Sequence, residues 1–175
     1  GKVIFDNKPV FNFNFEAWQQ IRGKDIAFIF QNPQTALNPV RSCFSQLVES
    51  ITAHHPDWDK ISVDARIQEL LEDVDLTNVK NIRSAFPHEL SGGQLQRMVI
   101  AMALANHPKL IIADEPTSSL DKVTADKIIH RLVSLCRKQN TGLILISHDL
   151  HLIEAINDRI ILIIEGEKKA DVSID

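Results

Sequence analysis

Short, nearly continuous apolar runs recur along the chain, with longer amphipathic segments between them. The runs are predicted to be strands at residues 25–30, 110–113, 143–146 and 159–164. Residues 25–30 have the composition of a strand covered on both faces, and residues 159–164 are expected to form a last buried strand. Apolar residues at helical spacing predict helices in the intervening segments, at residues 92–106, 122–139 and 149–156. This alternation predicts an α/β fold in which a parallel sheet is built through right-handed crossovers.

The first half of the chain departs from this alternation. Residues 3–5 are predicted as a strand that runs into a turn, and residues 10–15, where apolar residues alternate with Asn, as a half-buried strand. Residues 31–34 are expected to form a loop. Residues 41–89 show helical periodicity with few strand signals and a cap at Ser62, so they are interpreted as a helical insert.

The composition is that of an ordinary soluble globular protein, with 175 residues of which 44% are hydrophobic and 24% charged. Its net charge of −4 argues against a nucleic-acid partner, because affinity for the phosphate backbone comes from clustered Lys and Arg. Cys43 and Cys136 stand in no zinc or disulfide spacing, and no apolar run approaches the roughly 20 residues of a membrane helix.

Polar side chains follow three of the apolar runs, namely Gln31, the pair Asp114 and Glu115, and His148. Ligands of parallel sheets bind beyond the carboxyl ends of the strands, so we expect these side chains to converge on one site. There Asp114 is suited to hold Mg²⁺, and Glu115 to polarise an attacking water in phosphoryl transfer. His148 is suited to act as a hydrogen-bonding switch on a terminal phosphate.

Each of these residues also has a local structural explanation. The dipeptide Asp114-Glu115, taken alone, is more often the start of a turn that caps the next segment. His148 also fits entry into a helix, and Gln31 fits a turn amide. Single residues leave these alternatives open.

A second candidate site lies where Ser91, Gly92 and Gly93 open an apolar-periodic segment. The free backbone N–H groups and the positive dipole end of a helix that begins there would form a seat for phosphate. The same three residues fit a tight turn before a helix, which remains an alternative.

Taken together, these motifs resemble the nucleotide-binding subunit of ATP-binding cassette (ABC) transporters. The matching segments are residues 90–94 (signature motif), 110–115 (Walker B strand and its glutamate), 118–121 (D-loop), Gln31 (Q-loop) and His148 (H-loop). Residues 21–40 and 86–90 further resemble the branch of importers for dipeptides, oligopeptides and nickel.

The resemblance implies a P-loop NTPase-like α/β fold, with a parallel sheet flanked by helices and an inserted helical subdomain. It divides the chain into a partial ATP-binding core at residues 1–40, a helical subdomain with the signature motif at 41–96, and an ATP-binding core at 97–175. The implied cofactors are ATP and Mg²⁺. The implied partners are a second ABC ATPase subunit, packed head to tail, and transmembrane permease subunits that receive the helical subdomain at the cytoplasmic face of the membrane.

Residue roles follow from the resemblance alone. Catalytic roles fall to Glu115 as general base and His148 as sensor of the γ-phosphate. Metal roles fall to Asp114 and to Gln31, which also bridges the site to the helical insert. Contacts to the ATP of a partner subunit, and to the partner itself, fall to Ser91, Gly92, Gly93, Gln94 and Asp121.

One family motif, the phosphate loop Gly-x-x-x-x-Gly-Lys-[Ser/Thr], does not occur among these residues, whose glycines stand at positions 1, 23, 92, 93, 142 and 166. Aligned with the family pattern, residue 1 falls after that loop, so the N-terminal part of the fold is expected to be missing. We therefore expect the 175 residues alone to bind ATP weakly and to hydrolyse it negligibly.

The leading hypothesis is an ABC ATPase subunit that couples ATP hydrolysis to the import of peptides or nickel. The alternative is a truncated, catalytically inactive remnant that acts at most as an interaction module in trans to an intact partner. A soluble ABC protein of translation or repair is a third interpretation, which the acidic charge balance disfavours.

Overall fold

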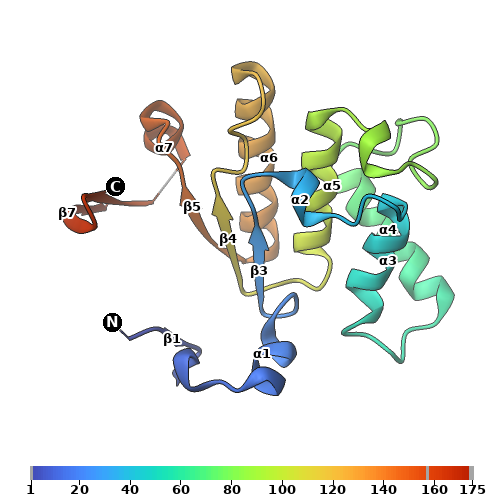
Figure 1. Ribbon diagram of the computed structural model, residues 1–175, viewed down its shortest axis with the longest axis horizontal. Helices are drawn as coiled ribbons and strands as arrows, with labels where there is room; N and C mark the ends of the chain where they lie inside the picture. The colour runs from blue at the N-terminus through green and yellow to red at the C-terminus, as the bar shows by residue number, and fades with distance from the viewer. Residues whose placement is uncertain (1, 157, 174–175) are drawn as a thin grey trace.

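Three parallel strands form the centre of the fold in the computed structural model, which describes residues 2–156 and 158–173. They are β3 (Ile26–Ile29), β4 (Leu110–Asp114) and β5 (Gly142–Ile146), and they pair in that order. Because both pairings are parallel, the carboxyl ends of all three strands share one edge, at the top of Figure 1. The predicted α/β class and parallel sheet are confirmed.

Two long helices cover one face of this sheet. Helix α5 (Gly92–Leu104) packs against β3, helix α6 (Lys122–Gln139) packs against β5, and the two helices contact each other (Figure 1). The largest fully buried side chains are Ile29, Leu47, Ile51, Ile67, Leu70, Leu76, Leu95, Met98, Leu104, Ile111, Ile129 and Leu132. On the opposite face of the sheet, Phe28 and Ile144 keep 43% and 49% of their surface exposed.

A lobe of helices lies beside the sheet, at the right of Figure 1. It contains α3 (Cys43–Thr52) and α4 (Lys60–Asp73), which both pack on α5. Turns then lead to the short 3₁₀ helix η2 (Pro87–Glu89). The predicted cap at Ser62 is wrong, because the side chain of Asp59 accepts the Ser62 N–H at 2.8 Å and α4 begins one residue after Asp59.

The prediction of a strand at residues 10–15 is also wrong. This segment forms the 3₁₀ helix η1 (Val10–Asn12) and the start of α1 (Phe15–Ile21). Asn14 Oδ1 accepts the Ala17 N–H at 2.9 Å, so this asparagine caps a helix instead of facing water from a strand. Before it, the strand β1 (Ile4–Phe5) turns into β2 (Lys8–Pro9), which confirms the predicted strand and turn.

The loop predicted at residues 31–34 is wrong in its second half. Asn32 Oδ1 accepts the Gln34 N–H at 3.0 Å and starts the short helix α2 (Pro33–Ala36). A proline at the first helical position supports this start, since it gives up no intrahelical hydrogen bond there.

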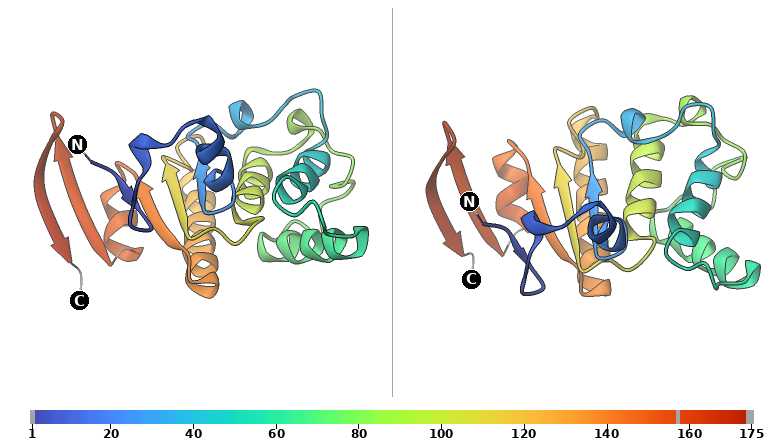
Figure 2. Two further views of the ribbon diagram at one scale, coloured as in Figure 1. Left: turned by 90° about the horizontal axis from the view of Figure 1, so that it is seen from below. Right: turned by 60° about the horizontal axis from the view of Figure 1, so that its bottom comes forward.

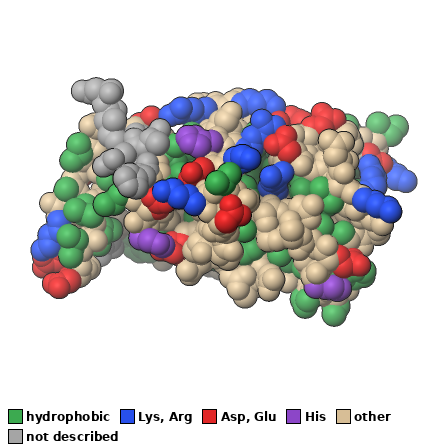
Figure 3. All heavy atoms as spheres, turned by 90° about the horizontal axis from the view of Figure 1, so that it is seen from above, with side chains coloured by type: hydrophobic (Ala, Val, Ile, Leu, Met, Phe, Trp, Pro, Cys, Tyr) green, Lys and Arg blue, Asp and Glu red, His purple; other side chains and the backbone are tan. Residues whose placement is uncertain are grey.

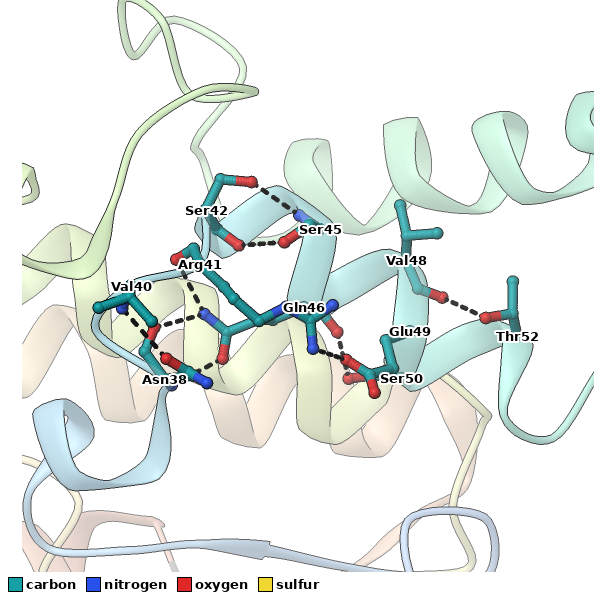
Figure 4. Close-up of polar contacts among 10 residues, drawn as sticks. All are labelled: Asn38, Val40, Arg41, Ser42, Ser45, Gln46, Val48, Glu49, Ser50 and Thr52. Atoms are coloured by element: carbon teal, nitrogen blue, oxygen red, sulfur yellow. Dashed lines mark hydrogen bonds and ion pairs between the residues drawn. The ribbon is translucent and has the colours of Figure 1, made fainter.

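The chain between α2 and α3 is held by one glutamine, Gln46 of α3 (Figure 4). Its Oε1 accepts the backbone N–H of Asn38 at 2.8 Å, and its Nε2 donates to the carbonyls of Asn38 and Arg41 at 3.0 and 3.1 Å. All three contacts use backbone atoms of the connecting segment, so they tie this segment to α3.

After α7 (Leu150–Ile156), the chain ends in an antiparallel hairpin of β6 (Arg159–Ile164) and β7 (Glu167–Ser173). The prediction of a last, buried strand at residues 159–164 is wrong in both respects, since β7 follows and Ile163 is 66% exposed. Within the described residues the hairpin does not pair with the sheet of β3, β4 and β5, and Figure 2 shows it standing apart. An apolar run identifies the strand but not the layer that covers it.

No helix in the described part of the chain combines the length and the apolar character that crossing a membrane requires.

The buried side chain of Arg66 ties α4 to the end of α5. Its Nε donates to the Ala105 carbonyl at 3.0 Å and its Nη2 to the Leu104 carbonyl at 2.7 Å, while Nη1 pairs with Glu69 at 2.6 Å. The last carbonyls of a helix have no partner within the helix, so the guanidinium satisfies two of them at once.

We expect Arg66→Lys to lower the free energy of unfolding by about 1–3 kcal/mol. An ammonium group cannot reproduce the hydrogen bonds of the planar guanidinium to both carbonyls, and so it leaves a buried carbonyl unpaired. Urea unfolding measures the loss. Arg41→Lys is the matched control, since Arg41 pairs with Glu49 on the surface, with 44% and 60% of the two side chains exposed, and the expected change is within about 0.5 kcal/mol. Equal losses in the two variants would contradict the role of Arg66.

Candidate active site at the carboxyl edge of the sheet

The ends of three neighbouring strands bring Gln31, Glu115 and His148 together. Gln31 follows β3, Glu115 follows β4 and His148 follows β5. Gln31 Nε2 donates to Glu115 Oε2 at 3.3 Å, and His148 Nδ1 lies 2.8 Å from Glu115 Oε1. The expected convergence of these three side chains is confirmed, and the carboxylate of Glu115 is its centre.

The backbone of Glu115 adopts the left-handed conformation, with φ at 42°. This conformation is uncommon for residues other than glycine and carries strain of order 1–3 kcal/mol, which the surrounding structure must offset. The Glu115 N–H donates to the Ile146 carbonyl at the end of β5, at 2.9 Å. The strand therefore ends abruptly at Asp114, and the Glu115 side chain is directed to partners from both neighbouring strands.

The contact with Glu115 also determines which ring nitrogen of His148 carries a proton. An ionised carboxylate only accepts hydrogen bonds, so Nδ1 of His148 is the donor. This hydrogen bond, and then the negative charge of Glu115, raise the pKa of His148 above its usual 6.5. The imidazole is largely exposed, so Nε2 remains accessible as a second donor for an anionic ligand when the ring is protonated.

A cavity of 220 Å³ opens beside the Glu115–His148 pair. Ser118, Lys122 and Ser147 are among its lining residues. Ser147 was not among the predicted site residues, and its Oγ accepts the Asp149 N–H at 3.1 Å. Its place one residue after β5 is the signal from which it could have been found.

Asp114 is the last residue of β4 and its side chain is exposed at the same edge. Among the described residues, no group of three or more His, Cys, Asp or Glu side chains could hold a metal ion by itself. Mg²⁺ commonly binds through one or two protein oxygens and completes its shell with water and phosphate. An exposed carboxylate at Asp114 fits an open site of this kind.

The predicted phosphate seat forms the start of α5, with Ser91 as its cap. Ser91 Oγ accepts the Gln94 N–H at 3.3 Å, and Gln94 Oε1 accepts the Ser91 N–H at 2.9 Å. The two side chains thus satisfy each other's backbone, as in other capping boxes. Gly92 and Gly93 lie in the first turn, where N–H groups have no carbonyl partner within the helix.

Both glycines also lie in close packing, Gly92 against the residue before Asp121 and Gly93 against α6. A Cβ at Gly92 would lie 3.2 Å from Leu120 Cδ2, and one at Gly93 would lie 3.1 Å from Thr124 Cγ2. Asp121 caps α6 by accepting the Thr124 N–H at 3.0 Å, and hydrogen bonds from the Thr124 side chain and then from its N–H lower the pKa of Asp121. The Ser91–Gln94 block and Asp121 are therefore neighbours at the starts of α5 and α6.

Figure 3 looks onto the carboxyl edge of the sheet. Acidic, basic and histidine side chains are interspersed there with hydrophobic ones. A ligand at this edge meets individual charged groups and not a broad field of one sign.

Several known proteins are similar to this chain in sequence and in fold. The family profile described as ABC transporter matches residues 1–118. The oligopeptide transport ATP-binding protein OppD of Lactococcus lactis subsp. cremoris is 37% identical over 175 residues, which are 100% of this chain and 52% of OppD. The dipeptide transport ATP-binding protein DppD of Haemophilus influenzae is 40% identical over 163 residues, or 93% of this chain and 49% of DppD. The chain spans about half the length of these relatives.

Solved structures share the fold. A dimeric, post-hydrolysis structure of the ATP-binding cassette MJ0796 bound to ADP and Pi has a TM-score of 0.85 and 29% identity, covering 99% of this chain and 73% of that one. CbiO1 from Clostridium perfringens, part of the ABC transporter complex cbiONQ, has a TM-score of 0.81 at 24% identity, covering 99% and 66%. The α/β fold of this chain is therefore the fold of these cassettes. The chain belongs to the ABC transporter family, as the resemblance of its motifs predicted.

We expect Glu115→Gln to lower the pKa of His148, because the hydrogen bond to a charged acceptor and the charge itself are removed. Titration of the imidazole signals by nuclear magnetic resonance measures the change. Because the pKa of His148 is raised in the folded state, the contact contributes its full stabilisation at pH values below the pKa of the unfolded state, near 6.5. This contribution is lost as the pH rises through the pKa of the folded state. The remote variant Glu49→Gln is the control, and an identical His148 titration in both variants would refute the contact.

Proposed function

We propose that these residues form the hydrolytic part of the ATP-binding subunit of an ABC importer, which couples ATP hydrolysis to the import of peptides. The observation that supports this proposal is the position of the Glu115 carboxylate. It is held between Gln31 and His148 at the edge where parallel sheets bind ligands. The similarity to the oligopeptide transport protein OppD and the dipeptide transport protein DppD supports peptides as cargo in preference to nickel.

In this proposal Glu115 accepts a proton from the water that attacks the γ-phosphate of ATP. His148 donates from Nε2 to that phosphate, with the Nδ1 contact to Glu115 holding the ring. Asp114 and Gln31 hold Mg²⁺ together with water and phosphate oxygens. Mg²⁺, when bound, neutralises negative charge on the phosphates.

In this proposal, residues Ser91–Gln94 contact a different ATP molecule from the one at Glu115. Ser91, Gly92, Gly93 and Gln94 contact the ATP of a second ABC ATPase subunit packed head to tail, and Asp121 joins the two subunits. The first-turn N–H groups of α5 support a phosphate contact, and the dimeric form of the MJ0796 cassette supports the pairing.

The wider assembly follows the same family pattern. Residues 41–96 serve as the helical subdomain, between core segments 1–40 and 97–175, and dock on a transmembrane permease subunit at the cytoplasmic face of the membrane. The lobe of α3 and α4, which packs on α5 beside the sheet, supports this division. The alternative of an inactive chain that acts only in trans rests on the absence of a Gly-x-x-x-x-Gly-Lys-[Ser/Thr] pattern from the 175 residues.

We expect Glu115→Gln to lower kcat for ATP by about 10²–10⁴-fold in the full-length protein that contains these residues, because the amide cannot accept the proton of the attacking water. A steady-state phosphate-release assay measures the loss. Glu16→Gln, an exposed change in the first turn of α1, is the matched control and should keep the native rate. Native turnover in Glu115→Gln would exclude Glu115 as the base, and no turnover in the native protein would favour the trans-acting alternative.

A further inference from the structure

Gln31 contacts Glu115 through its nitrogen and not through the oxygen that a metal would use. Its Nε2 donates to Glu115 Oε2 at 3.3 Å, while His148 Nδ1 engages the other oxygen, Oε1, at 2.8 Å. We propose that Gln31 is a positioning residue that orients the Glu115 carboxylate for proton abstraction, an inference that rests on the proposed ATPase function.

Two donors on two different oxygens fix a carboxylate in a way that one donor does not. A carboxylate held at Oε1 alone can still turn about its terminal bond, which is a broad torsion. A second hydrogen bond at Oε2 sets the plane of the group. Each oxygen has two acceptor positions, so both Oε1 and Oε2 keep one for a water molecule.

The backbone around Gln31 is well placed to keep this donor in position. Before it, Phe30 stacks on Phe28, with ring centroids 6.1 Å apart and an interplanar angle of 13°. After it, Asn32 caps α2 through the Gln34 N–H at 3.0 Å. Gln31 therefore stands between a residue stacked on β3 and a helix cap, although its own side chain is exposed.

The two ends of the Gln31 amide are chemically distinct. In the described structure Nε2 is used by Glu115, and no residue described here donates to Oε1. The oxygen can therefore serve Mg²⁺ while the nitrogen orients the base. Substitutions that remove one end and keep the other separate the two roles.

Gln31→Glu provides this separation, because it keeps an oxygen ligand, loses the N–H donor and places a second negative charge beside Glu115. In the full-length protein we expect kcat for ATP to fall about 10²-fold, since misplacement of a catalytic group by about 1 Å has this effect. The Mg²⁺ concentration at half-maximal rate should stay the same or fall. In a Glu115→Gln background, Gln31→Glu should cause no further loss. Gln34→Met, on exposed α2, is the control and should keep the native rate.

A second readout needs no nucleotide. In the nucleotide-free chain, Glu115→Ala should move the proton signal of the Gln31 side-chain amide upfield, because its acceptor is lost, and the remote change Glu49→Ala should not. A Gln31→Glu variant with native kcat, a further loss in the Glu115→Gln background, or an unmoved amide signal would each overturn the positioning role. Absence of Glu115-dependent turnover in the native protein would instead overturn the proposed function on which it rests.

Discussion

Parallel hydrogen bonding between β3, β4 and β5 is the constraint on which the rest of the structure depends. It places three carboxyl ends on one edge, and so brings Gln31 to Glu115 across 84 positions of sequence and Glu115 to His148 across 33. None of the three residues could form these contacts within its own segment. The left-handed backbone of Glu115, held by a hydrogen bond to the end of β5, then directs one carboxylate to both neighbours.

The same sheet positions the helical lobe through its packing with α5 and a small set of polar contacts. Asn106, just after α5, donates from Nδ2 to the carbonyls of Gly23 and Ser50 at 2.7 and 2.9 Å, which joins the turn before β3 to α3. Arg66 joins α4 to the end of α5. The helix that begins with the signature residues is therefore anchored at its far end to both the sheet and the lobe, while its first turn packs against α6 at Gly93 and against Leu120, just before α6, at Gly92.

Much of this arrangement could be predicted from the sequence, because apolar periodicity distinguishes helices from strands, although it does not show which layer covers a strand. The helix at residues 122–139 has the predicted bounds, and the strand at 110–113 is longer by one residue. The prediction of a strand at residues 10–15 was wrong because an Asn side chain there hydrogen-bonds to the backbone and caps a helix. Hydrophobic periodicity carries no information about such hydrogen bonds. The strand-end rule predicted that the polar residues converge. It could not predict that Glu115 takes a left-handed conformation, or which atom of Gln31 it meets, because both depend on tertiary contacts.

We propose that the phosphates of ATP are hydrolysed at the carboxyl edge of the sheet. A crystal structure of the full-length protein with Mg²⁺ and a non-hydrolysable ATP analogue tests it most directly. We expect the γ-phosphate within hydrogen-bond distance of His148 Nε2, with a water between that phosphate and Glu115. A nucleotide bound instead in the larger 540 Å³ cavity, which Trp18, Phe28 and Met102 line, with no phosphate near Glu115, would contradict it.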